Sequence, residues 1–297
     1  MSGRQLARLA AVLGALLLLW AAVAIAGRRA AAGAAVGERL LGADTSKVDS
    51  VMLSGPRDTT ALVRSTGGWT VNGHPAARDE ITALLRALAD TSRFDLVAES
   101  EASHPRLGVS ADSGRRLRVA GNRGIELIVG AKPGGFGGGY ARRADGRAVY
   151  QLRGGLPGLV ARPPDEWRDK TIAVISTDSI TTIEVVRARE RYELRRDGSR
   201  WRFARGVAAD SVRAADLVRA LARIDASGFA TPAQADSAQF TPPARRLTVK
   251  GAGRTLVALV FDSTADGFRV RGDSGGTVWR IDTGEADRIT PPVASLR

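Results

Sequence analysis

The chain has 297 residues, 44% of them hydrophobic, which is enough for about two domains with sizeable buried cores. It contains no cysteine, and this excludes disulfides, thiolate metal ligands and cysteine nucleophiles. Its formal net charge of +13 comes almost entirely from arginines scattered along the chain, whereas a nucleic-acid footprint would be clustered. We therefore expect a solvated basic surface and no nucleic-acid partner.

The first predicted element is an apolar segment, Leu9–Ala26, with 18 consecutive uncharged residues. At about 1.5 Å per residue, a helix over this segment reaches about 27 Å, close to the thickness of a bilayer core. A cleaved signal peptide and an uncleaved signal anchor both fit, and the length of the run favours the anchor. The sequence thus predicts a transmembrane helix within residues 1–26, an Ala/Gly-rich tether over 27–46, and a soluble part outside the cytoplasm, on the periplasmic or cell-surface side.

The rest of the chain contains an internal repeat. The segment VDSVMLSGPRDTTALVRSTGGWTV begins at Val48 and is matched by ITTIEVVRARERYELRRDGSRWRF from Ile180, so that Trp69 and Trp201 stand 132 positions apart. Further matches follow in the same order at similar offsets: LLRALAD with LVRALAR, LRVAG with LTVKG, and AVYQL with TVWRI. These matches predict repeat unit 1 over residues 47–152, a connector over 153–179, repeat unit 2 over 180–285 and a C-terminal tail over 286–297.

Each copy predicts the same secondary structure. The segments ALVRSTGGWTV and YELRRDGSRWRF are alternating runs broken by a glycine-containing turn, which indicates a hairpin. Apolar residues at helical spacing then predict one amphipathic helix per copy, with Asp79 and Asp210 near the helix starts, and further strand-like runs follow. The predicted fold is α+β: two tandem repeats, each a mostly antiparallel sheet with one packed helix, preceded by one transmembrane helix. We expect Trp69 and Trp201 to fill the cores of the two repeats.

A glycine-rich window, KPGGFGGGYARR at Lys132–Arg143, raises the question of a phosphate-binding loop. Such a loop offers backbone N–H groups at a helix N-terminus, and its P-loop form ends in Gly-Lys-Ser/Thr. Here the lysine precedes the glycines, strand-like segments flank the window, and copy two has DSTADG (Asp262–Gly267) at the same place. We therefore expect a plain hairpin connection in preference to an anion site.

Few residues qualify as catalytic or metal-binding candidates. The two histidines, His74 and His104, are each followed by proline, and no histidine–carboxylate cluster has the spacing of a zinc site. Ser103 and Glu101 lie close to His104 in the sequence, but adjacent residues rarely form a catalytic triad, and copy two has no matching histidine.

Two carboxylate pairs, Asp79-Glu80 and Asp165-Glu166, could in principle serve as general acids and bases. The first is expected in the opening turn of a helix, where acidic residues interact favourably with the helix dipole, and the second in the connector. We expect both pairs to be structural. The sequence therefore predicts no catalytic, cofactor-binding or metal-binding residue and no cofactor.

The ordered pattern resembles domain-of-unknown-function family 4340, a group of bacterial proteins. The resemblance rests on GGWTV, ITALLRALADTSRF, LGV at Leu107–Val109, the glycine-rich window with its flanking strands, and the connector PPDEWRDKTI at Pro163–Ile172. It covers roughly residues 48 to 281. The resemblance implies a membrane-anchored extracytoplasmic protein encoded beside ABC-type transport subunits similar to those of gliding-motility systems, and it carries over no catalytic residue.

We expect a non-enzymatic, membrane-tethered scaffold or accessory subunit, with an ABC-type transporter complex as its partner. The alternative is an extracytoplasmic module that binds an anionic glycan or lipid through its arginines and the glycine loop. A third hypothesis, a hydrolase, requires a pocket with convergent polar groups around His74 or His104. The sequence predicts no oligomeric state.

Overall fold

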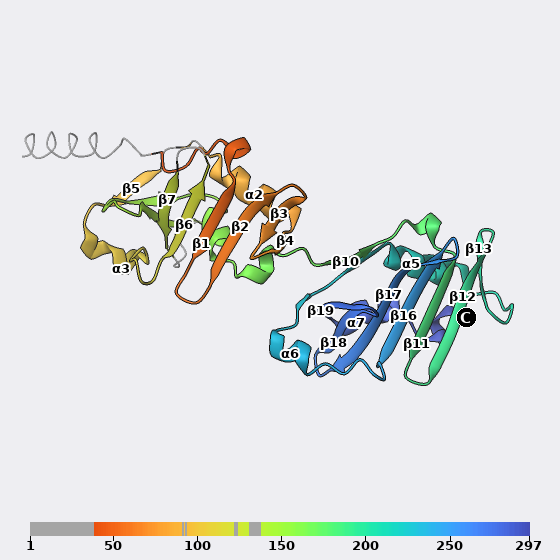
Figure 1. Ribbon diagram of the computed structural model, residues 1–297. Coiled ribbons are helices and arrows are strands. Elements are labelled where there is room, and N and C mark those ends of the chain that lie inside the picture. Colours follow the sequence, from red (N-terminus) through yellow and green to blue (C-terminus); the bar gives the residue numbers. More distant parts are fainter. Residues whose placement is uncertain (1–38, 91, 93, 122–123, 131–137) are drawn as a thin grey trace, which may run out of the picture. The chain divides into compact units, whose positions relative to one another are not determined.

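The computed structural model describes residues 39–297 except 91, 93, 122–123 and 131–137 (Figure 1). The expected transmembrane helix and most of the expected tether lie outside the described residues. Within the described part of the chain, no helix is both long enough and apolar enough to cross a membrane. The chain divides into two compact units, of which unit 1 ends at Asp169 and unit 2 spans Lys170–Arg297.

Unit 1 contains a sheet with the strand order β4-β3-β2-β1-β6-β7-β8-β9-β5, in which all neighbours are antiparallel. Its strands are β1 (Ser50–Ser54), β2 (Thr59–Ser65), β3 (Gly68–Val71), β4 (His74–Pro75), β5 (Asp95–Ala98), β6 (Arg115–Ala120), β7 (Ile125–Val129), β8 (Gly139–Arg143) and β9 (Val149–Leu152). Its helices are η1 (Thr45–Lys47), α2 (Arg78–Leu88), η2 (Glu101–Ser103), α3 (His104–Leu107), α4 (Leu156–Ala161) and η4 (Pro164–Trp167).

Unit 2 contains an antiparallel sheet with the order β13-β12-β11-β16-β17-β18-β19-β15 and a separate pair, β10-β14. Its strands are β10 (Thr171–Val174), β11 (Thr182–Arg187), β12 (Glu190–Asp197), β13 (Arg200–Phe203), β14 (Arg223–Asp225), β15 (Gly228–Phe229), β16 (Arg245–Gly251), β17 (Arg254–Thr264), β18 (Gly267–Gly272) and β19 (Gly275–Ile281). Its helices are η5 (Thr177–Ser179), α5 (Ser211–Ala222), α6 (Pro232–Asp236), α7 (Thr283–Ile289) and η6 (Val293–Leu296).

The strand orders of the two large sheets correspond. Each strand of the unit 2 sheet has a counterpart at the same place in the unit 1 sheet: β11 and β1, β12 and β2, β13 and β3, β16 and β6, β17 and β7, β18 and β8, β19 and β9, β15 and β5. Unit 1 has one further strand, β4, at one edge. A longer helix, α2 or α5, follows the first three-strand meander in each unit. The predicted class, α+β with antiparallel sheets and few helices, is confirmed.

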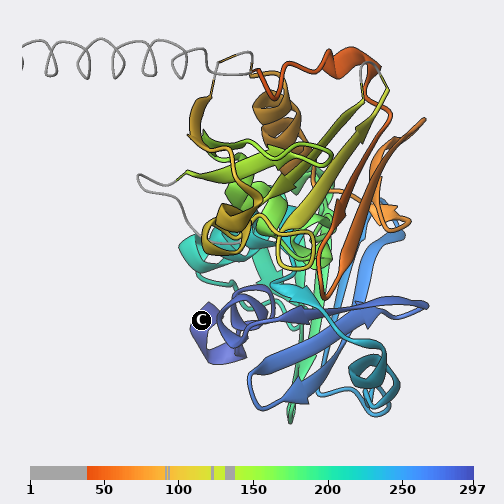
Figure 2. The same cartoon turned by 90° about the vertical axis from the view of Figure 1, so that its left-hand side faces the viewer.

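One face of each sheet forms the core, because buried and exposed residues alternate along the strands. On β1 the buried Val51 and Leu53 flank Met52, which is 42% exposed on the opposite, outer face. Helix α2 packs Leu84 and Leu88 against the inner face, and Figure 2 shows it lying to one side of β1 and β6. In unit 2, α5 and α7 cover the inner face in the same way.

A short segment covers part of the outer face of unit 1. Leu107 and Val109, at the end of α3 and just beyond it, pack on Ile128 and Val149 of strands β7 and β9 and form a small second cluster. In unit 2 the segment that contains α6 lies against β18, where the Arg269 guanidinium donates to the Gln234 carbonyl (2.6 Å). The outer faces of β1 and β2, and of β11 and β12, carry no such cover in the described part of the chain.

The predicted hairpins and helices are confirmed as β2–β3, β12–β13, α2 and α5. Asp210 is the N-cap of α5 and accepts from two backbone N–H groups, whereas Asp79 lies in the first turn of α2 without capping it. Trp201 is buried, with 8% of its surface exposed. Trp69 is only partly buried and packs at the border of the unit 1 core, and the Arg64 guanidinium lies over its ring, 5.3 Å from the ring centroid.

Two segments that were expected to lie outside the repeats belong to the cores. The expected connector (153–179) contains Trp167, which is fully buried in unit 1, and its last part forms β10 of unit 2. The expected tail (286–297) places Ala286, Ile289 and Leu296 in the core of unit 2. These segments are too short for a helical spacing of apolar residues to be recognised in the sequence. The predicted boundaries of the two repeat units are therefore narrower than the folded units.

Candidate binding groove

The two histidines occupy structural positions. His74 is exposed on the edge strand β4. His104 is 8% exposed in α3, and its Nε2 donates to the carbonyl oxygen of Arg147 (2.8 Å). Glu101 pairs with the Arg147 guanidinium (3.2 Å), and no hydrogen bond joins His104 to Ser103 or Glu101 in the described residues. The structure thus does not assemble a triad from these residues.

The two carboxylate pairs lie close to arginines. Glu80 pairs with Arg162, whose guanidinium also lies 3.9 Å from Glu166. Asp165 pairs with Arg168 at 3.1 Å. Asp79 is exposed in the first turn of α2. Among the described residues, no group of histidine and carboxylate side chains is arranged to hold a metal ion.

The glycine-rich window joins two neighbouring strands. Strands β7 and β8, which flank it, pair antiparallel, as expected for a hairpin connection, and residues 131–137 lie outside the described part. Gly138 has a packing role, since a Cβ on it would lie 2.1 Å from the carbonyl oxygen of Leu152 on β9. The prediction of a connection between strands is therefore confirmed by the pairing of its flanks.

A groove in unit 2 has a volume of about 1010 Å³. It borders the outer face of β11 and β16, passes the end of β13, and reaches the C-terminal residues. It is lined by Glu184, Val185, Val186, Arg189, Glu190, Arg191, Tyr192, Glu193, Phe203, Ala204, Arg205, Val207, Ala208, Arg246, Thr248, Val293 and Arg297. Four chain segments far apart in sequence thus meet in one place: the β11–β12 hairpin, the end of β13 with the loop after it, strand β16, and the end of the chain.

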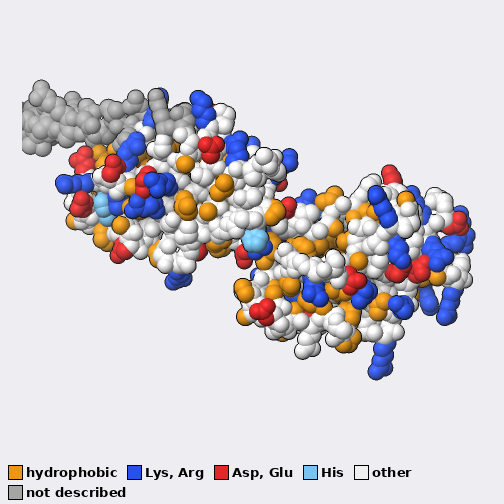
Figure 3. Space-filling model, viewed as in Figure 1, with side chains coloured by type: hydrophobic (Ala, Val, Ile, Leu, Met, Phe, Trp, Pro, Cys, Tyr) orange, Lys and Arg blue, Asp and Glu red, His pale blue; other side chains and the backbone are white. Residues whose placement is uncertain are grey.

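The groove has an excess of positive charge. Its carboxylates are all engaged within the unit: Glu184 with Lys250, Glu193 with Arg195, and Glu190 with the Val293 backbone N–H (3.2 Å). By contrast, four exposed arginines of the groove make no ion pair with any described residue: Arg189, Arg191, Arg205 and Arg297. Figure 3 shows basic side chains gathered over the part of unit 2 that carries β12 and β13.

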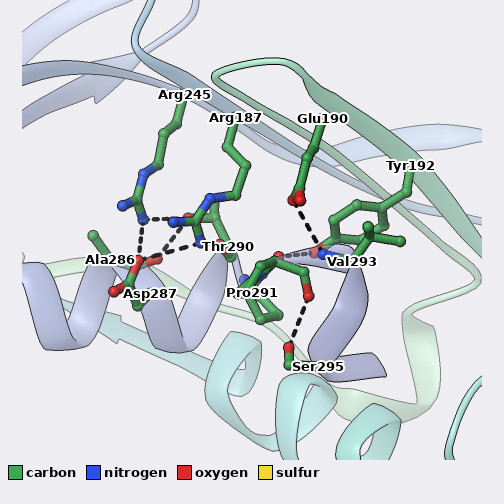
Figure 4. Close-up of polar contacts among 11 residues, drawn as sticks. Arg187, Glu190, Tyr192, Arg245, Ala286, Asp287, Thr290, Pro291, Val293 and Ser295 are labelled. Atoms are coloured by element: carbon green, nitrogen blue, oxygen red, sulfur yellow. Dashed lines mark hydrogen bonds and ion pairs between the residues drawn. The ribbon is translucent and has the colours of Figure 1, made fainter. Parts of the chain in front are cut away.

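One wall of the groove is held by a polar cluster that joins the sheet to the chain end (Figure 4). Asp287 of α7 accepts from Arg245 (2.7 Å) and lies 3.3 Å from Arg187. Arg187 also donates to the Thr290 carbonyl (2.9 Å), and Arg245 to the Thr290 hydroxyl (3.0 Å). The Tyr192 hydroxyl donates to the Pro291 carbonyl (2.7 Å). We call these residues the C-terminal cluster.

The C-terminal cluster is sheltered from solvent, and this changes two pKa values. Burial lowers the pKa of Arg245, and the hydrogen bond that its guanidinium donates to Asp287 opposes that effect. Burial also raises the pKa of Tyr192 above its ordinary value of 10.0, so the phenol stays protonated and can donate to Pro291. The cluster therefore fixes the C-terminal segment, and with it Val293 and Arg297, beside the groove.

The arrangement suits binding more than catalysis. The groove brings together guanidinium groups, which recognise carboxylates and phosphates through paired hydrogen bonds, with the apolar Val186, Val207 and Phe203. Sequence reasoning missed the groove, because its lining residues come from four distant segments. The closest signal was the basic run around Arg195–Arg205, which marks two of its strands.

Fold and groove define a two-unit α+β protein with antiparallel sheets and a basic groove on its second unit. The chain belongs to the family described as Domain of unknown function (DUF4340), which matches residues 69–243. No curated protein and no solved structure matches the chain.

Proposed function

We propose that the protein is a membrane-tethered, extracytoplasmic accessory subunit that binds a partner and performs no reaction of its own. The observation that supports the proposal most strongly is the use of the titratable residues: His104 and the acidic residues of the groove are engaged in internal hydrogen bonds and ion pairs. What the molecule offers to a partner is open sheet surface, on the outer faces of β1–β2 and β11–β12.

The membrane tether is supported by the uncharged segment Leu9–Ala26. A transporter complex of the ABC type is the partner that we propose. After mild detergent extraction, isolation of the protein through a tag before Val48 should recover integral transporter subunits in constant proportion. Repeated recovery of the protein alone, or release of the intact chain into the soluble fraction, would contradict this role.

We also propose that both units derive from one copied module. The corresponding strand orders support this, as does the offset of 132 positions between Trp69 and Trp201. Duplication explains how one unit could retain a structural role while the other acquired a basic groove. Experimental coordinates in which the two tryptophan-bearing meanders differ in topology would contradict the duplication.

A second candidate function is binding of an anionic glycan or lipid, and the exposed arginines of the groove that make no ion pair favour it. Sedimentation with anionic vesicles, or titration with an anionic polysaccharide, at two salt concentrations tests this candidate. Electrostatic binding should weaken strongly at the higher salt concentration. The matched control carries Arg189→Gln, Arg191→Gln and Arg205→Gln, and equal binding by this variant would contradict a role for the groove.

A further inference from the structure

The two large sheets differ at the edge of their second strand, which is β2 in unit 1 and β12 in unit 2. In unit 1, β3 ends at Val71, opposite Leu62, so Thr59–Ala61 of β2 extend past it. Asn72 covers this stretch: its backbone N–H donates to the Ala61 carbonyl (2.9 Å), and its side-chain oxygen accepts from the Ala61 N–H (2.8 Å). The Asn72 side-chain nitrogen donates to the Thr59 carbonyl (3.1 Å).

The Asn72 carboxamide therefore replaces one peptide group of a missing strand. A carboxamide has the same donor and acceptor as a peptide unit, so it can complete the ladder at a sheet edge. Edges left without such cover are templates for pairing with another chain. Unit 1 thus closes this edge with its own side chain.

Unit 2 leaves the same edge open. Strand β13 ends at Phe203, opposite Leu194, so Glu190–Glu193 of β12 extend past it. Ala204 stands where unit 1 has Asn72, and its N–H donates to the Glu193 carbonyl (3.0 Å), but it carries no carboxamide. In the described residues no hydrogen bond reaches the Glu193 N–H or the Arg191 carbonyl on this side. The backbone N–H and C=O groups of alternate residues in a strand point to the same edge. The Glu193 N–H and the Arg191 carbonyl therefore both point away from β11.

The turn after β13 explains the difference. In unit 1 the Asn72-Gly73 pair forms a two-residue turn, with Asn72 at φ 47° and Gly73 at φ 83°. In unit 2 the turn is one residue longer, since the Phe203 N–H donates to the Val207 carbonyl (2.8 Å) across Ala204–Gly206. This added residue also accounts for the change of offset between the repeats from 132 to 133.

The open edge borders the basic groove, so backbone and side chains can act together. Arg191 is on the edge itself, and Arg189 and Arg205 flank it without internal ion pairs. Val207, 59% exposed, adds an apolar contact on the same side. A second copy of β12 would bring arginine against arginine, and like charges in facing strands repel. A strand with acidic side chains would instead neutralise them.

We propose that the edge of β12 at Glu190–Glu193 binds an extended, acidic segment of a partner protein as an added strand. The partner backbone pairs with the Glu193 N–H and the Arg191 carbonyl, and its carboxylates pair with Arg189, Arg191 and Arg205. This proposal rests on the binding role proposed above and specifies the chemistry of the partner. Its test needs neither a membrane nor a transporter, so a failure of this proposal can be told apart from a failure of the proposed function.

The first test uses the full chain in detergent and a fluorescein-labelled nonapeptide of alternating glutamate and valine, with binding followed by fluorescence anisotropy. The control peptide has the same sequence with an N-methyl group on every residue, which preserves charge but removes the N–H donors from both edges of the peptide and so prevents pairing with a strand. The N-methylated peptide should bind at least about tenfold more weakly, since the lost backbone bonds correspond to that factor. Equal binding of the two peptides would overturn the proposal and indicate attraction of a polyanion only.

The second test changes the protein. Replacing Ala204–Gly206 by the dipeptide Asn-Gly should give β12 the cover that β2 has. Because this replacement also removes Arg205, it is compared with Arg205→Gln, and it should bind the peptide more weakly than Arg205→Gln does. Circular dichroism checks that the turn variant folds; if it does not, Arg191→Gln combined with Arg205→Gln should weaken binding by at least about tenfold at low salt. Equal binding by the folded turn variant and Arg205→Gln, or unchanged binding by the double variant, would overturn the proposal.

Two further controls separate the alternatives. Asn72→Gly opens the edge of β2, where the groove arginines are absent, and it should add no binding of the acidic peptide. Analytical ultracentrifugation of the full chain should give the same mass for wild type and the turn variant. Wild-type dimers that the turn variant converts to monomers would show that a second copy occupies the edge, and would overturn the proposal.

Discussion

The two units use similar alternating strands in the same order, yet their outer faces differ in chemistry. In unit 1 the facing outer positions of β1 and β2 are Met52 and Ala61. The corresponding positions of unit 2 are Glu184 and Glu193, which engage Lys250 and Arg195. The inner positions are apolar in both units, because helices pack against them. Packing therefore constrains one face of each sheet, and the other face was free to change.

The edges of the second strands, β2 and β12, also differ between the two units. Unit 1 closes the end of β2 with Asn72, whereas unit 2 leaves the end of β12 open beside a basic groove. The two sheets thus combine the same strand order with one closed edge and one open edge beside a basic groove. The changes below would break or sharpen this comparison, from the largest expected effect to the smallest.

Trp201→Ala should destabilise unit 2 more than Trp69→Ala destabilises unit 1. Trp201 is 8% exposed, so its removal leaves a cavity and should cost about 3 kcal/mol. Trp69 is only partly buried, and its loss should cost about half as much. Urea unfolding of the full chain, with hydrogen exchange of peptides from each unit, measures both. Equal costs would mean that the two tryptophans are packed alike.

Asp287→Ala should destabilise unit 2 by about 2 kcal/mol, because it removes the carboxylate that faces the nearly buried Arg245. Asp216→Ala is the matched control: its carboxylate is similarly exposed, 47% against 45%, but pairs with an exposed arginine. The control should cost less than about 0.5 kcal/mol. Chemical denaturation reads out both variants, and a similar cost for the two would refute the role assigned to the C-terminal cluster.

Asn72→Gly should cost unit 1 about 1 kcal/mol, through the loss of two side-chain hydrogen bonds. Glycine tolerates the φ of 47° at this position, so the cost reports the side chain and not backbone strain. In hydrogen exchange, the Ala61 amide should be protected in the wild type and exposed in the variant. The Glu193 amide should exchange quickly in the wild-type protein, and slow exchange there would contradict an open edge.

The smallest effect expected is the pH dependence of Tyr192. Its pKa is raised by burial, so its contribution to stability is complete below pH 10 and is lost as the pH rises further. Tyr192→Phe should cost about 1 kcal/mol at neutral pH, and the difference from wild type should shrink above pH 10. Thermal unfolding of both proteins between pH 8 and about pH 11 measures this. A constant difference over that range would place the hydroxyl outside the core.

Local patterns predicted much of the fold. The alternation around Gly67-Gly68 and Asp197-Gly198 identified both hairpins, and the spacing of Leu84 and Leu88 identified α2. These features depend on neighbours within a few residues. The glycine-rich window was correctly placed between strands for the same reason.

Long-range arrangements escaped prediction. The partners of Asp287 are about 40 and 100 residues away, and no periodicity records such distances. The Asn72-Gly73 pair is a recognised turn signal, but its role as an edge cover depends on β2 being longer than β3. The groove could not be predicted from the sequence, because its four segments meet only in the folded unit.

The C-terminal cluster has a practical consequence for anyone who labels this protein. Arg297 lines the groove, and its guanidinium lies 5.9 Å from the ring of Phe203. A purification tag or fluorescent protein attached after Arg297 would begin beside the groove and restrict access to it. Reporters are better inserted at the turn around Gly198, where an added Cβ would meet no atom within 4 Å and which lies at the opposite end of β12.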